Sequence, residues 1–302
     1  MCAGSDANPL EQATERATKE FEALRPQLFG IAYRVLGSCV EAEDIVQDSW
    51  LRWQTVDHAD IQNPAAFLTT VTTRLAINAA QSARMRRESY VGPWLPEPVD
   101  TSSDPQLGAE RAEVLDLAVL FLLEKLNPVE RAAYVLREAF DYPYKEIAGI
   151  LETSESNARQ LVSRSRKYLT AERREPVSSG AHQRLLKAFI TAARSGDMAA
   201  LEEVLAADVV SYADGSGARG ASRIPIVGRQ HVAKTFVAYA PRFWPGTDIR
   251  WVEANGRPAA LVSTDGAVVA LVTADVSVQG IERVLWVVTP AKLAAYVASL
   301  GR

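Results

Sequence analysis

Cysteine and long apolar runs are scarce in this chain of 302 residues. Its two cysteines, Cys2 and Cys39, supply neither a disulfide framework nor a thiolate metal site, and we expect no cofactor. The most apolar stretch, residues 258–278, is interrupted by Asp265 and Asp275, so we predict no membrane segment. No basic-then-apolar leader pattern precedes the first helix, and we therefore expect a cytoplasmic protein.

Charge is distributed unevenly along the chain, although the net value is only -4. Residues 1–60 carry five basic and eleven acidic side chains, whereas residues 154–174 carry six basic and two acidic ones. The acidic part would repel nucleic acid and suit a basic protein partner, while the basic part would attract phosphates. The pattern indicates two partners of opposite charge.

The basic segment belongs to a predicted helix-turn-helix. Asn127-Pro128 is typical of a helix start, Pro143 separates a short second helix, and Ser154 is an N-cap for a third. The third helix has a buried stripe beginning at Ala158 and a polar, basic opposite face, which is the arrangement that reads DNA in the major groove. The alternative is a charged helix that is merely solvated. Its predicted DNA-facing residues are Ser156, Arg159, Gln160, Ser163, Arg164, Arg166 and Lys167.

Three helices are predicted in the acidic part. The second begins with a capping box at Ser38 and directs Asp44, Gln47 and Asp48 outward. The third begins at Asn63-Pro64 and ends in a basic cluster, residues 84–87. Its expected buried stripe is Phe67, Leu68, Val71, Leu75 and Ala79.

The rest of the chain consists of a proline-rich linker and a mixed domain. Residues 88–106 contain four prolines among polar residues, a composition that cannot build a core and should be extended. After residue 181 come helices and then four β-rich runs separated by turns, which predict an antiparallel meander against helices. Enzymatic candidates in this domain form no evident acid–base pair, so we expect no enzyme. They are Asp208, Asp214, His182 and His231.

These motifs resemble the extracytoplasmic-function sigma factors of bacterial RNA polymerase, in the group with a C-terminal SnoaL-like domain. Residues 42–50 are similar to the segment that docks on the β′ clamp helices, and residues 144–169 are similar to the reader of the -35 promoter element. The resemblance implies promoter DNA and core polymerase, through its β′ clamp helices and β flap, as partners. It implies polymerase binding by Asp44, Gln47, Asp48 and Trp50. For the -10 element it suggests Arg74, Asn78, Ser82, Arg84, Arg86 and Arg87.

The same resemblance covers the linker and the last domain. Residues 94–98 resemble a proline-rich linker motif, and residues 214–219 and 289–293 resemble two signatures of the SnoaL-like domain, each with substitutions. The regulatory residues that follow are Trp94, Leu95, Pro96, Glu97, Pro98, Asp214, Gly215, Gly217 and Lys292.

The predicted architecture is multidomain, with two all-α sigma modules followed by an α+β SnoaL/NTF2-like domain with a curved sheet. The expected order is a disordered tail (1–17), region 2 (18–90), linker (91–111), region 4 helix-turn-helix (112–171), linker (172–181) and regulatory domain (182–302). The alternatives are a bifunctional sigma factor whose last domain binds or converts a small apolar ligand, and a plain helix-turn-helix regulator.

Overall fold

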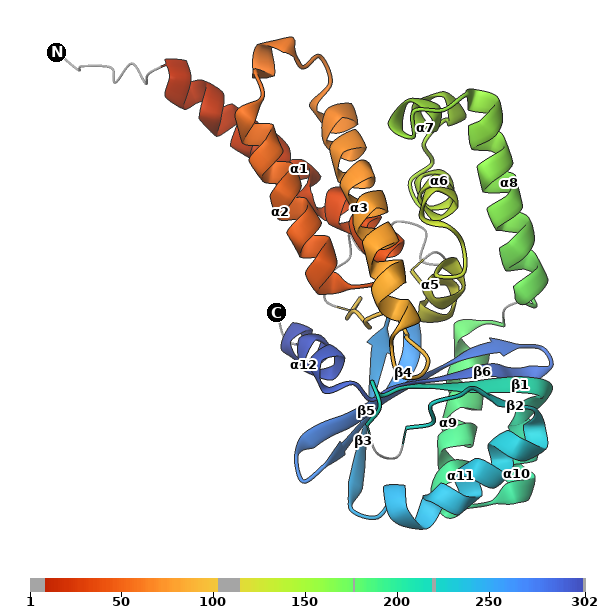
Figure 1. Cartoon of the computed structure of the whole chain (residues 1–302). Helices are drawn as coiled ribbons and strands as arrows, with labels where there is room; N and C mark the ends of the chain where they lie inside the picture. Colours follow the sequence, from red (N-terminus) through yellow and green to blue (C-terminus); the bar gives the residue numbers. More distant parts are fainter. Residues whose placement is uncertain (1–8, 103–114, 176, 219–220, 301–302) are drawn as a thin grey trace. The chain divides into compact units, whose positions relative to one another are not determined.

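Two units make up the computed structural model, which describes residues 9–102, 115–175, 177–218 and 221–300 (Figure 1). The first unit combines residues 1–83 with 127–165, and the second combines residues 84–126 with 166–302. Within the described residues, no helix is long and apolar enough to cross a membrane.

Helices are the regular structure of the first unit in its described residues. It contains α1 (Pro9–Leu36), α2 (Cys39–Thr55), the 3-10 turn His58–Asp60, most of α3 (Pro64–Glu88), α6 (Pro128–Glu138), α7 (Tyr144–Ile150) and the larger part of α8 (Glu155–Glu172). Trp53 is fully buried between α1 and α3, and its indole N–H donates to the Ala17 carbonyl at 2.9 Å. The burial of Trp53 and its hydrogen bond together fix the packing of these helices.

The helix-turn-helix packs on α1 within this unit. Ile31 joins the core formed by Leu136, Ile147 and Val162. Buried Arg131 donates to the Val35 carbonyl at 2.6 Å, satisfying one of the free carbonyls at the end of α1. The predicted caps are confirmed. Asn127 Oδ1 accepts from Glu130 N, and Ser154 Oγ accepts from Asn157 N.

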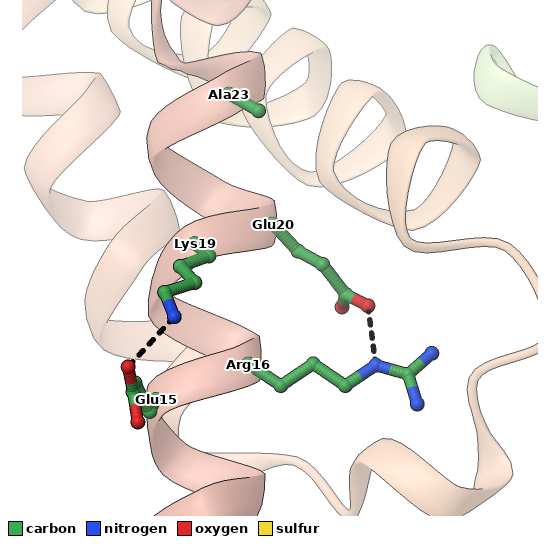
Figure 2. A pocket seen from close by; sticks show the side chains of 5 residues that line it. All are labelled: Glu15, Arg16, Lys19, Glu20 and Ala23. Carbon is green, nitrogen blue, oxygen red and sulfur yellow. Dashed lines mark hydrogen bonds and ion pairs between the residues drawn. The ribbon is translucent and has the colours of Figure 1, made fainter.

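Two expectations differ from the structure here. Helix α1 begins at Pro9, well inside the expected tail of residues 1–17, and i,i+4 pairs on its surface such as Lys19–Glu15 support it (Figure 2). On α3, Leu68 is buried as expected, but Phe67, Val71, Leu75 and Ala79 are only half-buried. The helix also buries several small side chains, and one of them, Thr72, bonds Ser49 of α2 with 2.9 Å between the two hydroxyl oxygens. These side chains are Thr69, Thr72, Thr73, Ala76 and Ala80.

The second unit is built on a six-stranded sheet of order β2-β1-β6-β5-β4-β3. Its strands are β1 (Leu205–Asp214), β2 (Ile226–Val227), β3 (Thr247–Ala254), β4 (Arg257–Thr264), β5 (Ala267–Ser277) and β6 (Gly280–Val287). The predicted antiparallel meander is confirmed as β3 to β6, and β1 then pairs with β6 in parallel. Parallel pairing is possible because a long connection, β2, α11 and the strands β3 to β5, separates β1 from β6 in the chain.

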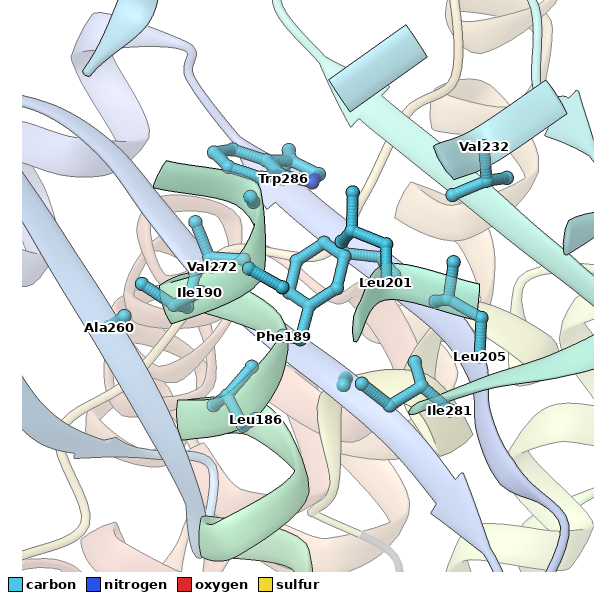
Figure 3. Close-up of a cluster of buried hydrophobic side chains, with 14 of the residues drawn as sticks. Leu186, Phe189, Ile190, Leu201, Leu205, Val232, Ala260, Val272, Ile281 and Trp286 are labelled. Atoms are coloured by element: carbon cyan, nitrogen blue, oxygen red, sulfur yellow. The ribbon is translucent and has the colours of Figure 1, made fainter. Parts of the chain in front are cut away.

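Each face of this sheet has its own apolar core. One face carries α9 (Ser179–Ser195), α10 (Met198–Val204) and α11 (Arg229–Phe243), with Phe189, Leu201 and Trp286 among the buried side chains (Figure 3). The other face is covered by α12 (Pro290–Ser299), α5 (Leu117–Leu123) and Leu95 of the linker. No residue of α5 is more than 4% exposed, so this short helix is part of the core of the second unit.

The proline-rich linker is extended, as expected, but it is not solvated. Leu95, Val99 and Asp100 are each less than 9% exposed. A polar, proline-rich segment could be buried because the sheet beneath it supplies both apolar surface and hydrogen-bonding partners. The remainder of the expected linker, from residue 103 to residue 111, lies outside the described residues.

Candidate interfaces for DNA, polymerase and the linker

Helix α8 presents all seven predicted DNA-facing side chains to solvent. Ser156, Arg159, Gln160, Ser163, Arg164, Arg166 and Lys167 are exposed, while Ala158, Leu161, Val162 and Ser165 are buried. Arg159 is held at one end of this face, with its guanidinium 4.4 Å from the Tyr144 ring centroid and 2.5 Å from Glu155. The pairing with Glu155 is exposed and weak, so it leaves Arg159 able to exchange onto a base edge.

Helix α2 presents the predicted acidic face. Asp44, Gln47 and Asp48 are exposed, and buried Ile45, Val46 and Trp53 fix the orientation of the helix. Trp50 is half-buried, with its ring centroid 4.9 Å from that of Phe21, so it packs against α1 as well as reaching the surface.

Two apolar side chains on this face were missed from the sequence. Val40 is 61% exposed and Leu51 is 52% exposed. Positions 40, 44, 47, 48 and 51 share one side of a helix, which is a spacing that could have identified them. The face therefore combines acidic side chains with two exposed apolar ones.

The basic end of α3 is only partly available. Asn78, Ser82, Arg84 and Arg86 are exposed. Arg74 instead binds the C-terminal end of α7, donating to the carbonyls of Ile150 at 2.9 Å and Gly149 at 3.2 Å and pairing with Glu152. It thereby satisfies carbonyls that a helix end leaves without partners.

Arg87 is occupied in the second unit. It pairs with Glu124 after α5, and its guanidinium lies 3.4 Å from the ring centroid of Trp94. The ammonium of Lys292 is also near this ring, at 4.2 Å. Trp94 is therefore a cation–π platform, and neither Arg74 nor Arg87 can bind DNA without first leaving these partners.

Asp214, the last residue of β1, is the centre of the predicted regulatory contact. It is fully buried, and its carboxylate accepts from the Leu95 amide at 2.8 Å, the Lys292 ammonium at 2.7 Å and the Tyr90 hydroxyl at 2.5 Å. Thr289 adds a fourth bond at 2.8 Å. A buried carboxylate is stable only when paired in this way.

Burial and the contact with Asp214 shift the pKa values of two neighbouring side chains. Burial lowers the pKa of Lys292, and Asp214 opposes that effect. Burial and the hydrogen bond to Asp214 raise the pKa of Tyr90. Tyr90, Thr289 and Arg87 were not recognised from the sequence as members of this site, because only the fold brings residues near 90, 214 and 290 together.

Steric crowding and backbone conformation explain why glycines occupy the turn after Asp214. A Cβ on Gly215 would lie 2.4 Å from that of Ala221, and a Cβ on Gly217, whose φ is +82°, would lie 3.4 Å from the Val91 side chain. The turn therefore allows the linker to approach closely. Arg219, the end of the predicted motif, lies outside the described residues.

Comparisons with known proteins identify the family of the chain. Models of sigma-70 region 2 and sigma-70 region 4 match residues 21–86 and 116–169. The ECF RNA polymerase sigma factor SigJ of Mycobacterium tuberculosis is 40% identical over 234 residues, 75% of this chain and 74% of that protein. The chain belongs to the extracytoplasmic-function RNA polymerase sigma factors. A probable sigma factor of the same organism, SigI, is 30% identical to this sigma factor over 287 residues, covering 93% of the chain and 96% of SigI.

A solved structure extends the likeness to the last domain. The crystal structure of SigJ has a TM-score of 0.73 and 32% identity, covering 92% of this sigma factor and 98% of that chain. The predicted fold class is thus confirmed, with two helical sigma regions followed by an α+β, SnoaL-like domain with a curved sheet. As a member of this family, the protein functions in promoter-specific initiation of transcription.

His182 lies near an ionic cluster of the second unit that includes Asp116, Arg257 and Asp275. His182 is 3% exposed, and its Nε2 has no partner among the described residues. Burial lowers its pKa, with Asp116 opposing and Arg257 adding to the effect. A histidine that is neutral when folded stabilises the fold above its unfolded pKa and loses that contribution as pH falls below it.

We therefore expect the second unit to lose stability below about pH 6.5, by up to about 1.4 kcal/mol per pH unit. The melting temperature should fall between pH 7.5 and pH 5.5, and His182→Gln should reduce this fall. His231→Gln, which alters an exposed histidine, is the matched control. An equal pH dependence in all three proteins would contradict this assignment.

Proposed function

We propose that this sigma factor binds the polymerase through the exposed face of α2 and reads promoter DNA through the exposed face of α8. The observation that carries the proposal is that both faces, of opposite charge, are accessible. Asp44 and Asp48 suit a basic surface such as the β′ clamp helices, and Val40 and Leu51 would supply apolar contacts beside them. The β flap is the second proposed polymerase contact, through region 4.

We infer distinct roles for the basic residues of α8. Arg159, Gln160 and Ser163 lie toward the start of the helix, where side chains reach base edges, and Arg164, Arg166 and Lys167 would bind phosphates. Arg84 and Arg86, with Asn78 and Ser82, remain candidates for the -10 element. The proposed partners, polymerase and promoter DNA, also place the action of the protein in the cytoplasm.

Selectivity tests this division. Arg159→Ala should lose discrimination between a matched and a scrambled -35 element by about 1–3 kcal/mol, whereas Lys167→Ala should weaken binding to both about equally. Competitive run-off transcription with core polymerase on the two templates measures the ratio. Arg159→Lys is the matched control, because it keeps the charge but loses the two-pronged geometry, so it should discriminate as poorly as Arg159→Ala. Equal losses on both templates for Arg159→Ala would contradict base reading by this residue.

We further propose that the SnoaL-like domain restrains the sigma regions by holding the linker. The contacts of Asp214 and Lys292 with residues 90–95, together with Arg87 on Trp94, support this role. Because Arg87 is a candidate for DNA binding, release of the linker would remove its contact with Trp94, and the proposed effect of the domain is inhibitory.

We infer that the domain does not catalyse a reaction. Asp208 forms an exposed ion pair with Arg174, His231 is exposed, Asp214 is buried with the linker and His182 lies in the ionic cluster. Within the described residues, none of these four bonds another, so no acid–base pair is formed.

A ligand-binding role for the domain is a second candidate. The buried indole N–H of Trp286 has no acceptor among the described residues, which favours a small molecule with an acceptor group. Against it, aromatic rings fill this part of the core, with Phe236 5.5 Å and Phe243 5.6 Å from Trp286 between ring centroids. Tryptophan fluorescence during a screen of small apolar carbonyl compounds would detect such binding.

A further inference from the structure

The turn between β3 and β4 is buried, which is unusual for the tip of a hairpin. Asn255 and Gly256 both have positive φ, 55° and 71°, as an Asn-Gly hairpin turn requires. Such turns normally project into solvent, but Asn255 is 0% exposed. The turn geometry itself needs no buried amide, since glycine would adopt the same backbone conformation.

The amide and backbone of Asn255 are used by the linker. Its N–H donates to the Val99 carbonyl at 2.9 Å, and its Oδ1 accepts from the Val99 N–H at 3.1 Å. Its Nδ2 donates to the carbonyl of Leu115 at 3.0 Å. One side chain thus joins the linker before residue 103 to the residue that precedes α5.

Neighbouring residues extend the contact on both sides. Thr101 donates to Glu253 at 2.7 Å and accepts from Gly256 N at 2.8 Å. Asp116, the N-cap of α5, accepts from Arg257 at 2.9 Å. The side chain of Asn255 and the backbone N–H groups of Asn255 and Gly256 therefore all bind residues of the linker or the residue before the N-cap of α5.

We propose that the Asn255 turn is a second anchor for the linker, independent of Asp214, by which the C-terminal domain positions the first helix of region 4. This proposal rests on the proposed restraint of the sigma regions by the C-terminal domain, and it identifies the residues through which that restraint acts on region 4. The two anchors share no partner, because Asp214 binds Tyr90 and Leu95 whereas Asn255 binds Val99 and Leu115. The first anchor holds the end of region 2, and the second holds the start of region 4.

Residue-resolved hydrogen–deuterium exchange on the full chain tests the proposal. Asn255→Gly keeps the positive φ and removes only the side-chain bonds. It should accelerate exchange at Val99 N–H and in α5, such as at Leu120, by about tenfold, while Leu95 N–H keeps its protection. Asp214→Asn should give the reverse pattern, with faster exchange at Leu95 and little change at Val99.

Three results would overturn the proposal. Unchanged exchange at Val99 and α5 in Asn255→Gly would show that the amide holds neither. Loss of exchange protection at both Leu95 and Val99 in each variant would show that the two anchors form a single cooperative contact. Loss of protection in the paired strand residues Val252 and Ala259 would show that Asn255 serves the hairpin itself. None of these measurements involves transcription, so failure here is distinct from failure of the proposed restraint.

Discussion

A sigma factor carrying Asp44→Arg and Asp48→Arg is expected to bind core polymerase at least about 100-fold more weakly than the unaltered protein, because reversing one side of a charged contact costs several kcal/mol. Both side chains are exposed on α2, away from its buried residues, so the fold should be unchanged. Binding to labelled core enzyme and run-off transcription should fall together.

The control must reproduce the change in charge. Glu203→Arg with Asp248→Arg alters two exposed acids of the second unit and raises the net charge by the same amount. This variant should bind polymerase normally. Equal weakening in both variants would mean that overall charge, and not the α2 face, governs assembly. Leu51→Ala is a smaller test of the same face and should weaken binding without altering charge.

Asp214→Asn is expected to lower the free energy of unfolding of the second unit by about 3–5 kcal/mol, because Lys292 is left as a buried cation without its counter-charge. The substitution preserves shape, so the loss reports on charge and hydrogen bonding. Urea unfolding followed by tryptophan fluorescence measures it. Asp208→Asn, which breaks an exposed pair with Arg174, should cost less than about 1 kcal/mol.

The same variant tests restraint by the C-terminal domain. At a temperature where Asp214→Asn remains folded by circular dichroism, weaker linker binding should loosen the contact of Trp94 with Arg87 and raise run-off transcription several-fold. A folded variant with reduced transcription would mean that the docked linker supports activity instead. Similar stability of Asp214→Asn and Asp208→Asn would show that the buried carboxylate does not organise this site.

The helices and their outward faces could be predicted because local signals determine them. Asn127, Ser38 and Ser154 are caps whose hydrogen bonds involve residues three positions away. The exposed face of α8 could be predicted because the buried residues of the helix recur at helical spacing and pack into a single core. Strand runs punctuated by glycine turns likewise predicted the meander, since each hairpin is a local structure.

The sequence could not predict that Arg74 and Arg87 bind other residues of the protein. Their partners, Ile150 and Glu124, are distant in sequence and are brought near only by packing. The stripe on α3 was misjudged for a related reason. Its helix buries threonines and alanines alongside Leu68 and Ile77, so hydrophobicity alone did not mark the inner face.

The linker showed the limit of composition as a guide. Prolines and polar residues correctly predicted an extended chain, but burial depended on the Asp214 and Asn255 contacts supplied by the last domain. A segment without a core of its own can thus be buried in that of another domain.

Burial of α5 by the sheet of the second unit means that the C-terminal domain is not a detachable module. Cutting the chain after residue 180 would uncover Leu117, Ala118 and Phe121, whose apolar neighbours include Leu271 and Tyr296. Such a shortened protein would be prone to self-association, and its transcriptional behaviour would mix lost control with a damaged promoter reader. Fusions and deletions of this protein should therefore respect a boundary that runs through region 4 rather than after it.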